Sequence, residues 1–444
     1  MRSRVLQLEI VCACVALALT AITPPAAAQP VPAPPVITVE AAVATALERN
    51  PSIVTATKTV EAAQARVVQA KAASALAVSI NASASVGNLA GGTPTGQDPR
   101  VSHTVNVGGS LLLYDGGIGA QQVVQAEAAL QAAQFGLEAT KQDVAVAAAR
   151  GYFQALRAAR VVEAREAALR SAQEQVRQAE ALVRAGTAAR ADIFTAQAAA
   201  ANAEVELIAA RGQVELTQAS LRNAMGVPLT QVFALAEPGD PQPVSITPEQ
   251  AATEAATARA EVKRAAADVR SSEAALRIAQ LRASLLVNVT AGAAVQVTPN
   301  PGQAGWSVGA SASYPIADGG KAKASIDEAQ ANLAAAQSRA ESTVQQVRLQ
   351  AFQAALSVRE FVARVAATRV ALAAAEEAAR AADGRYRAGV GTVLDVTIAQ
   401  ATLVQARVNS VQALYDLHQA IATLRHDLGQ PVLGRQVGRM GPAA

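Results

Sequence analysis

The sequence predicts a mainly α-helical protein with a membrane β-barrel portion, built from two tandem repeats that each hold a β-hairpin and long and short helices. The first observation is a duplication: the Asp-Gly-Gly at Asp115 recurs at Asp318, and this offset of 203 residues persists to residue 228 without a gap. The second is composition: hydrophobic residues make up 51%, aromatic residues only 3%, and alanine dominates. The third is a hydrophobic period that changes, within each repeat, from two residues to about 3.6.

The composition favours long helices packed side by side over ordinary globular domains. Alanine has the highest helix propensity, and its small side chain lets helices approach closely. A net charge of +3 is too small and too dispersed for a nucleic-acid-binding surface. No segment beyond the N-terminal region reaches the roughly 18 apolar residues of a membrane-spanning helix.

Residues 1–28 are predicted to be a secretory signal peptide. The start is positively charged, residues 11–21 are apolar but too few to span a bilayer, and Ala26–Ala28 offers a small-residue cleavage site. Both cysteines, Cys12 and Cys14, lie in this segment, so the mature chain is expected to have no disulfide, thiolate metal site or cysteine nucleophile. A lipoprotein anchored through Cys14 is the alternative.

The duplication and the proline-rich stretches predict the domain boundaries. After the signal peptide we expect a Pro-rich lead-in at 29–36, a first repeat at 37–228, a linker at 229–245, a second repeat at 246–431 and a C-terminal tail at 432–444. Thr38 and Thr247 are candidate N-caps of the first helix of each repeat. These short helices are expected to break at Asn50-Pro51 and at Arg259.

Four segments alternate with a period of two residues and are predicted strands: 78–86, 104–111, 287–295 and 307–314. One face is apolar, and the other is small, polar and uncharged, as a water-filled lumen requires. Lengths of about 9–11 residues suit tilted strands that cross a bilayer. A soluble β-sandwich is the alternative, although its core would need larger inward-facing residues.

The pattern after each Asp-Gly-Gly is helical. A helix over 118–184 contains no proline and would extend roughly 100 Å at 1.5 Å per residue. Gly186 breaks it, and a return helix is expected over about 192–225. The helix before the strands, expected from Ser52 to about Leu76, and the return helix could together pack along the long helix as a two-layer rod.

The strand-to-helix turns are predicted to be structural rather than ion-binding. Their glycines permit a sharp turn, and their carboxylates can cap the long helices. The residues are Asp115, Gly116, Gly117, Asp318, Gly319 and Gly320.

With these motifs in place, the chain resembles the TolC family of outer-membrane efflux proteins, also called outer membrane factors, from Ile37 to Pro431. The resemblance is carried by the two Asp-Gly-Gly turns, by Asn50-Pro51, and by Tyr386-Arg387-Ala388-Gly389 running on to Leu394-Asp395-Val396. It implies a homotrimer in the outer membrane whose 12-stranded β-barrel continues into a periplasmic α-helical barrel. Four strands cannot close a barrel alone, since the smallest membrane barrels have about eight. The small number of strands therefore predicts that several copies assemble. The resemblance implies that the number of copies is three.

The resemblance also implies a periplasmic gate. Asp192 and Asp395 match the family's gate aspartates and Tyr386 its gate tyrosine; carboxylates at a constriction would attract cations. Gly391 stands where the family has an arginine and Ile398 where it has a second aspartate, so Arg190 is a candidate for the missing cation. The alternative is an ordinary solvated hairpin tip.

The hairpin tips match the segment that contacts a periplasmic adaptor in the family. The residues are Gly186, Thr187, Ala188, Gly389, Val390 and Gly391. Small side chains would allow a partner's helices to approach closely. A simple helix stop explains the glycines equally well.

No catalytic chemistry or cofactor is expected. His103, His418 and His426 are far apart in the sequence and none has a neighbour at metal-ligand spacing, and no nucleophile–base pattern or phosphate loop occurs.

The resemblance implies an outer-membrane channel of a tripartite efflux system, which passively exports small molecules handed over by an inner-membrane pump and a periplasmic adaptor. A type I protein-secretion duct is an alternative that the sequence does not separate, and a soluble periplasmic helical scaffold is an alternative of a different class.

Overall fold

The computed structural model describes residues 35–73, 75–87, 100–241, 245–282, 285–297 and 303–433. The expected signal peptide with Cys12 and Cys14, almost all of the lead-in, and most of the tail lie outside the described residues.

The described elements repeat in the same order. The first repeat contains α2 (Val39–Arg49), α3 (Pro51–Ala72), β2 (Ala77–Gly87), β3 (Arg100–Tyr114), α4 (Ile118–Arg184) and α5 (Arg190–Met225). The second contains α6 (Pro248–Ala258), α7 (Ala260–Leu281), β5 (Leu286–Val297), β6 (Gln303–Ser313), α8 (Lys321–Arg387) and α9 (Val393–Asp427). Two further short strands, β1 (Val36–Ile37) and β4 (Ala234–Leu235), pair in parallel. The predicted fold class, mainly helical with two β-hairpins in tandem repeats, is confirmed.

The long helices α4 and α8 have 67 residues each, and α4 begins and ends where the sequence predicted. They lack proline, so no residue interrupts the backbone hydrogen-bond ladder. The return helix α5 begins at Arg190, two residues before its expected start. The expectation that the preceding helix reaches Leu76 was wrong: α3 ends at Ala72, because the alternating strand pattern takes over at Ala77.

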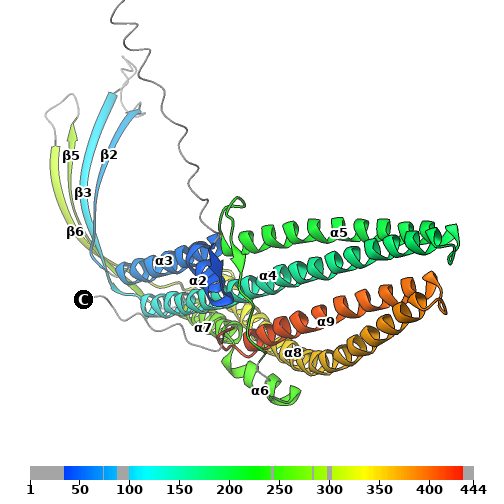
Figure 1. Cartoon of the computed structure of the whole chain (residues 1–444). Coiled ribbons are helices and arrows are strands. Elements are labelled where there is room, and N and C mark those ends of the chain that lie inside the picture. Colours follow the sequence, from blue (N-terminus) through cyan, green and yellow to red (C-terminus); the bar gives the residue numbers. More distant parts are fainter. Residues whose placement is uncertain are drawn as a thin grey trace, which may run out of the picture.

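The helices form two hairpins that lie beside each other (Figure 1). In each repeat the long helix packs against both shorter ones: α4 contacts α3 and α5, and α8 contacts α7 and α9. Contacts of α4 with α7 and α9 join the two repeats. The sheet extends from one end of this helical body, and the two helix–turn–helix tips lie at the opposite end (Figure 1).

The four long strands form one antiparallel sheet in the order β2-β3-β5-β6. The register places the predicted apolar positions opposite one another across the sheet: Ile80 pairs with Val107, Val107 with Ala293, and Ala293 with Trp306. One face of the sheet is therefore continuously apolar.

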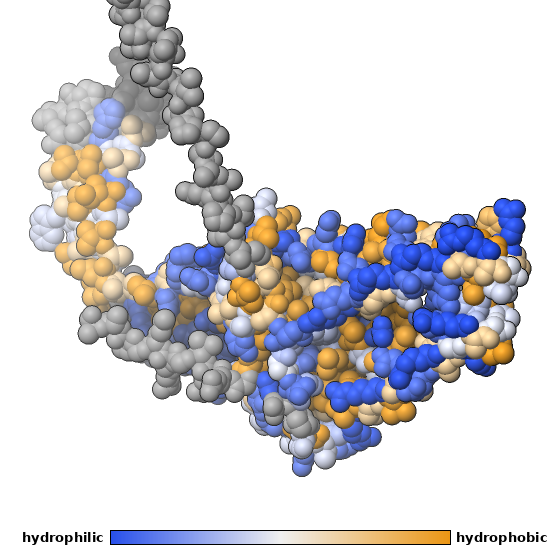
Figure 2. All heavy atoms as spheres, viewed as in Figure 1, coloured by the Kyte–Doolittle hydropathy of each residue, from blue (hydrophilic) through white to orange (hydrophobic). Residues whose placement is uncertain are grey.

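No second sheet covers this apolar face in the described part of the chain. Ile80 is 72% exposed, Val308 67% and Trp306 82%. Apolar residues gather visibly on the strands in Figure 2. The sandwich alternative required these side chains to be buried, so the structure contradicts it for a single chain.

The main core surrounds the middle of α4, where it is covered by α2, the end of α5 and the β1–β4 pair. Tyr152 is 1% exposed, and its hydroxyl lies 2.9 Å from the carbonyl oxygen of Ile37 and 2.7 Å from that of Ala236. A buried hydroxyl needs such partners, because its desolvation is otherwise unfavourable. Tyr152 thus fixes the N-terminal strand and the linker strand to the long helix.

Each strand-to-helix turn is stabilised by its aspartate. The Asp115 carboxylate accepts hydrogen bonds from the backbone N–H groups of Gly117 and Gly119, and Asp318 accepts them from Gly320 and Ala322. Gly117 and Gly320 have φ angles of 91° and 87°, which only glycine adopts readily. The backbone donors hold the pKa of Asp318 below its usual range.

The end of α5 packs against the break between α2 and α3. Gly226 ends α5 with a φ of 68°, and a Cβ added there would lie 2.7 Å from the Arg49 carbonyl oxygen. We expect Gly226→Ala to destabilise the protein by roughly 1–3 kcal/mol, because it adds both a left-handed conformation and a clash. The control is Gly212→Ala, inside α5 with nothing within 4 Å of the new Cβ, which should stabilise by up to about 1 kcal/mol. Thermal unfolding followed by helical circular dichroism measures both; equal midpoints for the two variants would contradict this account.

Candidate functional site

The turns at the two hairpin tips have the same backbone conformation. Gly186 and Gly389 adopt φ angles of 75° and 74° just after α4 and α8. The N–H of Thr187 donates to the Leu182 carbonyl, and the N–H of Val390 donates to the Arg385 carbonyl, at 3.0 and 3.1 Å. These bonds satisfy carbonyl groups that a helix end would otherwise leave unpaired.

The residues expected to contact an adaptor all lie in these two turns. Val390 is 76% exposed, and an added Cβ on Gly186 or Gly389 would meet nothing within 4 Å. Gly391 differs, since its added Cβ would lie 3.2 Å from the backbone of Arg385 and Tyr386. Close packing of the turn therefore gives a local reason for glycine at 391. Thr187 and Ala188 complete the first tip.

The side chain of Tyr386 is buried in the hydrophobic cluster next to the two tips. It is 4% exposed and packs in a small cluster with Ala179, Ala196, Val393 and Val396, which joins α4, α5, α8 and α9. Its hydroxyl is buried and has no hydrogen-bond partner among the described residues. Burial and then the negative charge of Asp192 raise the pKa of this hydroxyl. Tyr386 of the second hairpin is therefore buried within range of the charge of Asp192 from the first hairpin, without a hydrogen bond to it among the described residues.

The other two gate candidates are arranged differently. Asp395 forms a capping box with Thr392: its carboxylate accepts from the Thr392 N–H at 3.1 Å, and its own N–H donates to the Thr392 hydroxyl at 3.2 Å. These hydrogen bonds hold its pKa below the usual range. Arg190 is exposed and forms no ion pair with the described residues. The role of Arg190 as the cation of the gate stays a prediction.

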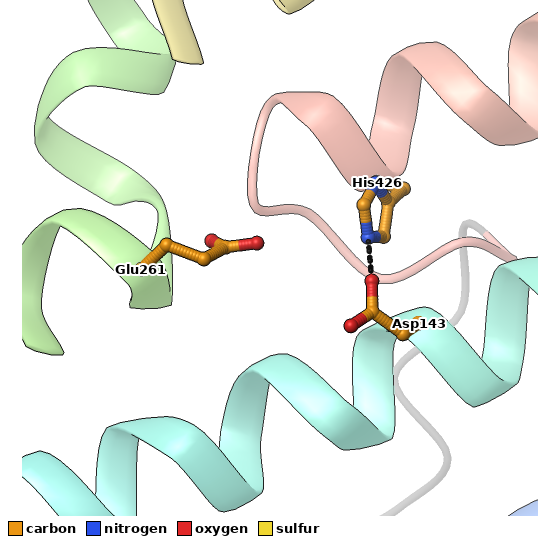
Figure 3. A group of neighbouring side chains, drawn as sticks. All are labelled: Asp143, Glu261 and His426. Carbon is orange, nitrogen blue, oxygen red and sulfur yellow. Dashed lines mark hydrogen bonds and ion pairs between the residues drawn. The ribbon is translucent and has the colours of Figure 1, made fainter. Parts of the chain in front are cut away.

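A second polar cluster was missed at the level of sequence. His426 at the end of α9, Asp143 in α4 and Glu261 in α7 place their ligand atoms within 4.8 Å of one another (Figure 3). Asp143 and His426 are 283 residues apart, so no local spacing could indicate the contact. Sequence spacing gave no sign of a site at His426, because Asp143 and Glu261 come from other helices.

The hydrogen bonds in this cluster disfavour a metal ion. Both oxygens of Glu261 accept from the Arg259 guanidinium, and both ring nitrogens of His426 face carboxylate oxygens. A cation would have to displace a buried arginine from Glu261. The cluster is better described as a network of ion pairs between the repeats.

Within the described residues, no helix combines the length and the apolar character that crossing a membrane requires.

Comparisons with known proteins agree with this architecture. The model of the family described as Outer membrane efflux protein matches residues 42–227 and 251–430. The outer membrane efflux protein BepC of Brucella suis biovar 1 is 29% identical over 371 residues, which cover 80% of this chain and 79% of BepC.

Solved structures show the same fold. The outer membrane protein VceC of Vibrio cholerae superposes with a TM-score of 0.76 at 22% identity, covering 89% of this chain and 97% of VceC. The open state of the MtrE outer membrane channel of Neisseria gonorrhoeae gives 0.72 at 21% identity, covering 89% of each chain. The resemblance to TolC-like channels is thereby confirmed. The chain belongs to the outer membrane efflux protein family, whose members are channels of the outer membrane that extend into the periplasm, and not enzymes.

Proposed function

We propose that this chain forms the outer-membrane channel of a tripartite efflux system and passively exports small molecules handed over by an inner-membrane pump and a periplasmic adaptor. The observation that carries the proposal is the open sheet. It has one apolar face and one small polar face, and among the described residues its two outer strands pair on one side only. Lipid can cover the apolar face, but no lipid can satisfy the unpaired backbone groups of an edge strand.

The open edges support assembly into a closed barrel. Three copies would supply 12 strands, within the range of membrane barrels, and a homotrimer is the assembly that the family resemblance implies. The internal repeat also supplies the pairing between copies. Since β6 corresponds to β3 and β2 to β5, the observed β3–β5 pairing predicts a β6–β2 pairing of neighbouring copies.

The register of the β3–β5 pair can be transferred by the repeat offsets to the β6–β2 junction between copies. Gly109 faces Ala291 within the chain, so Ala312 of one copy should face Ala82 of the next. Apolar positions then meet apolar positions at the new junction, as they do at the observed one. A closed barrel would have a lipid-facing outside and a small, uncharged polar lumen.

The tips support a gate and a docking site at the far end of the stalk. Asp192 lies in the first turn of α5 and Asp395 in the first turn of α9, so both carboxylates lie at the tip end of the hairpins. In a trimer up to six carboxylates would surround the axis and favour cations. The exposed turns at Gly186 and Gly389 would meet the adaptor. The free energy for export would come from the pump.

A type I protein-secretion duct remains the second candidate within the same class. The soluble periplasmic scaffold is disfavoured by the exposed apolar face of the sheet, which a water-soluble monomer would have to cover. We propose the domain limits 37–228 and 246–431 for the two repeats, with 229–245 as the linker.

The two faces of the sheet give a matched test of membrane insertion. Val308 lies on the apolar face of β6 and Ser307 beside it on the polar face. We expect Val308→Lys to reduce the yield of heat-modifiable, SDS-resistant oligomer, because a lysine in lipid is unfavourable by about 2–4 kcal/mol near the midplane. Ser307→Lys should leave the yield largely unchanged. Gel electrophoresis of detergent-extracted outer membranes measures both, and a soluble monomer in the wild type would remove the proposal.

The gate assignment is tested by removing charge without removing hydrogen-bond acceptors. We expect Asp192→Asn with Asp395→Asn to lower the cation preference of the pore, because the amide oxygen preserves the Thr392 cap while the carboxylate charge is lost. Reversal potentials in planar bilayers under a salt gradient measure the preference. The control is Glu174→Gln with Glu377→Gln, two exposed carboxylates paired to arginines of their own helices. Equal ion selectivity of the gate variant and the wild type would refute the assignment, while pore formation itself would still stand.

A further inference from the structure

Both repeats contain the same joint, in which the end of the return helix packs against the break between the two N-terminal helices. In the first repeat, Gly226 lies against Arg49 and Asn50; in the second, Gly429 lies against Ala258 and Arg259. An added Cβ would lie 2.7 Å from the Arg49 carbonyl oxygen at Gly226 and 3.2 Å from the Ala258 carbonyl carbon at Gly429. The φ angles of 68° and 69° favour glycine at both positions.

The two joints differ in their chemistry. In the first, the Asn50 amide donates to the Ala224 carbonyl at 2.9 Å, a neutral hydrogen bond. In the second joint, the residue that corresponds to Asn50 is Arg259, whose side chain is buried with an exposed fraction of 4%. Its guanidinium bonds Glu261 and lies 3.3 Å from an oxygen of Asp427, and it donates to Gln350 at 2.8 Å. Only the second joint is built from charges.

His426 completes the charged joint. It is 8% exposed, with Nδ1 2.8 Å from an oxygen of Asp427 and Nε2 3.0 Å from an oxygen of Asp143 in α4. Figure 3 shows the contact with Asp143 linking the end of α9 to the long helix of the other repeat. Ionised carboxylates only accept hydrogen bonds, and a neutral imidazole has a single N–H. Both contacts are satisfied together only when His426 carries two protons.

We propose that His426 is a proton-operated latch: as imidazolium it ties the second hairpin to α4 of the first repeat, and loss of its proton at alkaline pH releases this tie. The corresponding residue of the first repeat, at the same offset of 203, is Asn223, which does not titrate. The release is therefore confined to the joint of α9. This inference concerns movement between the repeats and does not depend on the cargo or partners proposed above.

The surrounding charges set the pH at which the latch opens. Asp143 from α4, Asp427 from α9 and Glu261 from α7 are negative, whereas Arg259 between α6 and α7 and Arg150 of α4 are positive. Burial by itself lowers the pKa of His426, but the hydrogen bonds to Asp143 and Asp427 outweigh it and raise the pKa to about 9. The same contact lowers the pKa of Asp143.

The raised pKa of His426 determines how the stability of the joint depends on pH. The pKa of His426 in the folded protein lies above its unfolded value of about 6.5. The stabilisation by His426 is therefore fully present below pH 6.5 and is lost as the pH rises through about 9. The joint should be closed at neutral pH and loosen under alkaline conditions.

Nitrogen-15 NMR of labelled histidine tests the protonation state directly, since the sequence has three histidines. We expect both ring nitrogens of His426 to be protonated at pH 7.5, with a midpoint near pH 9. Asp143→Asn, at an exposed carboxylate, should shift this midpoint toward 6.5. His418 serves as an internal reference, because burial against Phe153 lowers its pKa.

Three outcomes would overturn the latch. The first is a neutral imidazole at pH 7.5, and the second is a midpoint that Asp143→Asn leaves unchanged. The third is displacement of a ring proton by equimolar Zn²⁺ at pH 7.5, which would make the cluster a metal site instead.

Amide hydrogen exchange tests the mechanical consequence in the assembled protein. After correction for intrinsic rates, protection at the end of α9 and at the α6–α7 break should fall between pH 7.5 and pH 10 in the wild type. In His426→Asn, which installs the residue of the first repeat, protection should no longer depend on this pH change. His418→Asn is the matched control on the same helix and should keep the wild-type response. An equal pH response in His426→Asn and the wild type would contradict the proposal.

Discussion

The backbone groups along the outer edges of β2 and β6 are the constraint on which the rest of this structure depends. In the described part of the chain, each of these strands pairs on one side only, and none of the described elements covers the apolar face of the sheet that they bound. In a bilayer such edges are strongly unfavourable unless another strand pairs with them. In the proposed assembly the sheet of a single chain is one segment of the barrel wall, and the helices below it would arrange further copies around a common axis.

The helical part meets this requirement with small side chains. Alanine dominates the buried positions of α4, α8 and their partner helices, so the helices approach closely without large core residues. The strand-to-helix turns at Asp115 and Asp318 transmit the strand direction into the stalk, because each carboxylate fixes two backbone N–H groups at the start of a long helix. The charged joint at His426 adds a connection between the two hairpins that repeat symmetry alone does not provide.

The parts that could be predicted from sequence are those with a local physical cause. The bounds of α4 follow from glycines at either end and an uninterrupted helical pattern, and the strands follow from strict alternation. The β1–β4 pair has two residues per strand and is held by Tyr152, so it leaves no periodic signal. The contact of His426 with Asp143 depends on how two repeats pack, which no spacing encodes. Among the gate candidates, Tyr386 is buried where α4, α5, α8 and α9 join, and Asp395 caps its own helix. These placements depend on tertiary packing and on a local capping box, and only the capping box could be found in the sequence.

The most direct measurement of the central claim is disulfide cross-linking between copies. Ser110 faces Thr290 within the chain, and the repeat therefore places Ser313 of one copy opposite Asn81 of the next, with Cβ atoms about 5 Å apart. In a variant without Cys12 and Cys14, Ser313→Cys with Asn81→Cys should yield covalent dimers and trimers on mild oxidation in outer membranes. The pair Ser307→Cys with Asn81→Cys, displaced by about 20 Å along the strands, should not. Absence of intermolecular cross-links in the first variant, or equal cross-linking in both, would contradict a barrel closed by neighbouring copies.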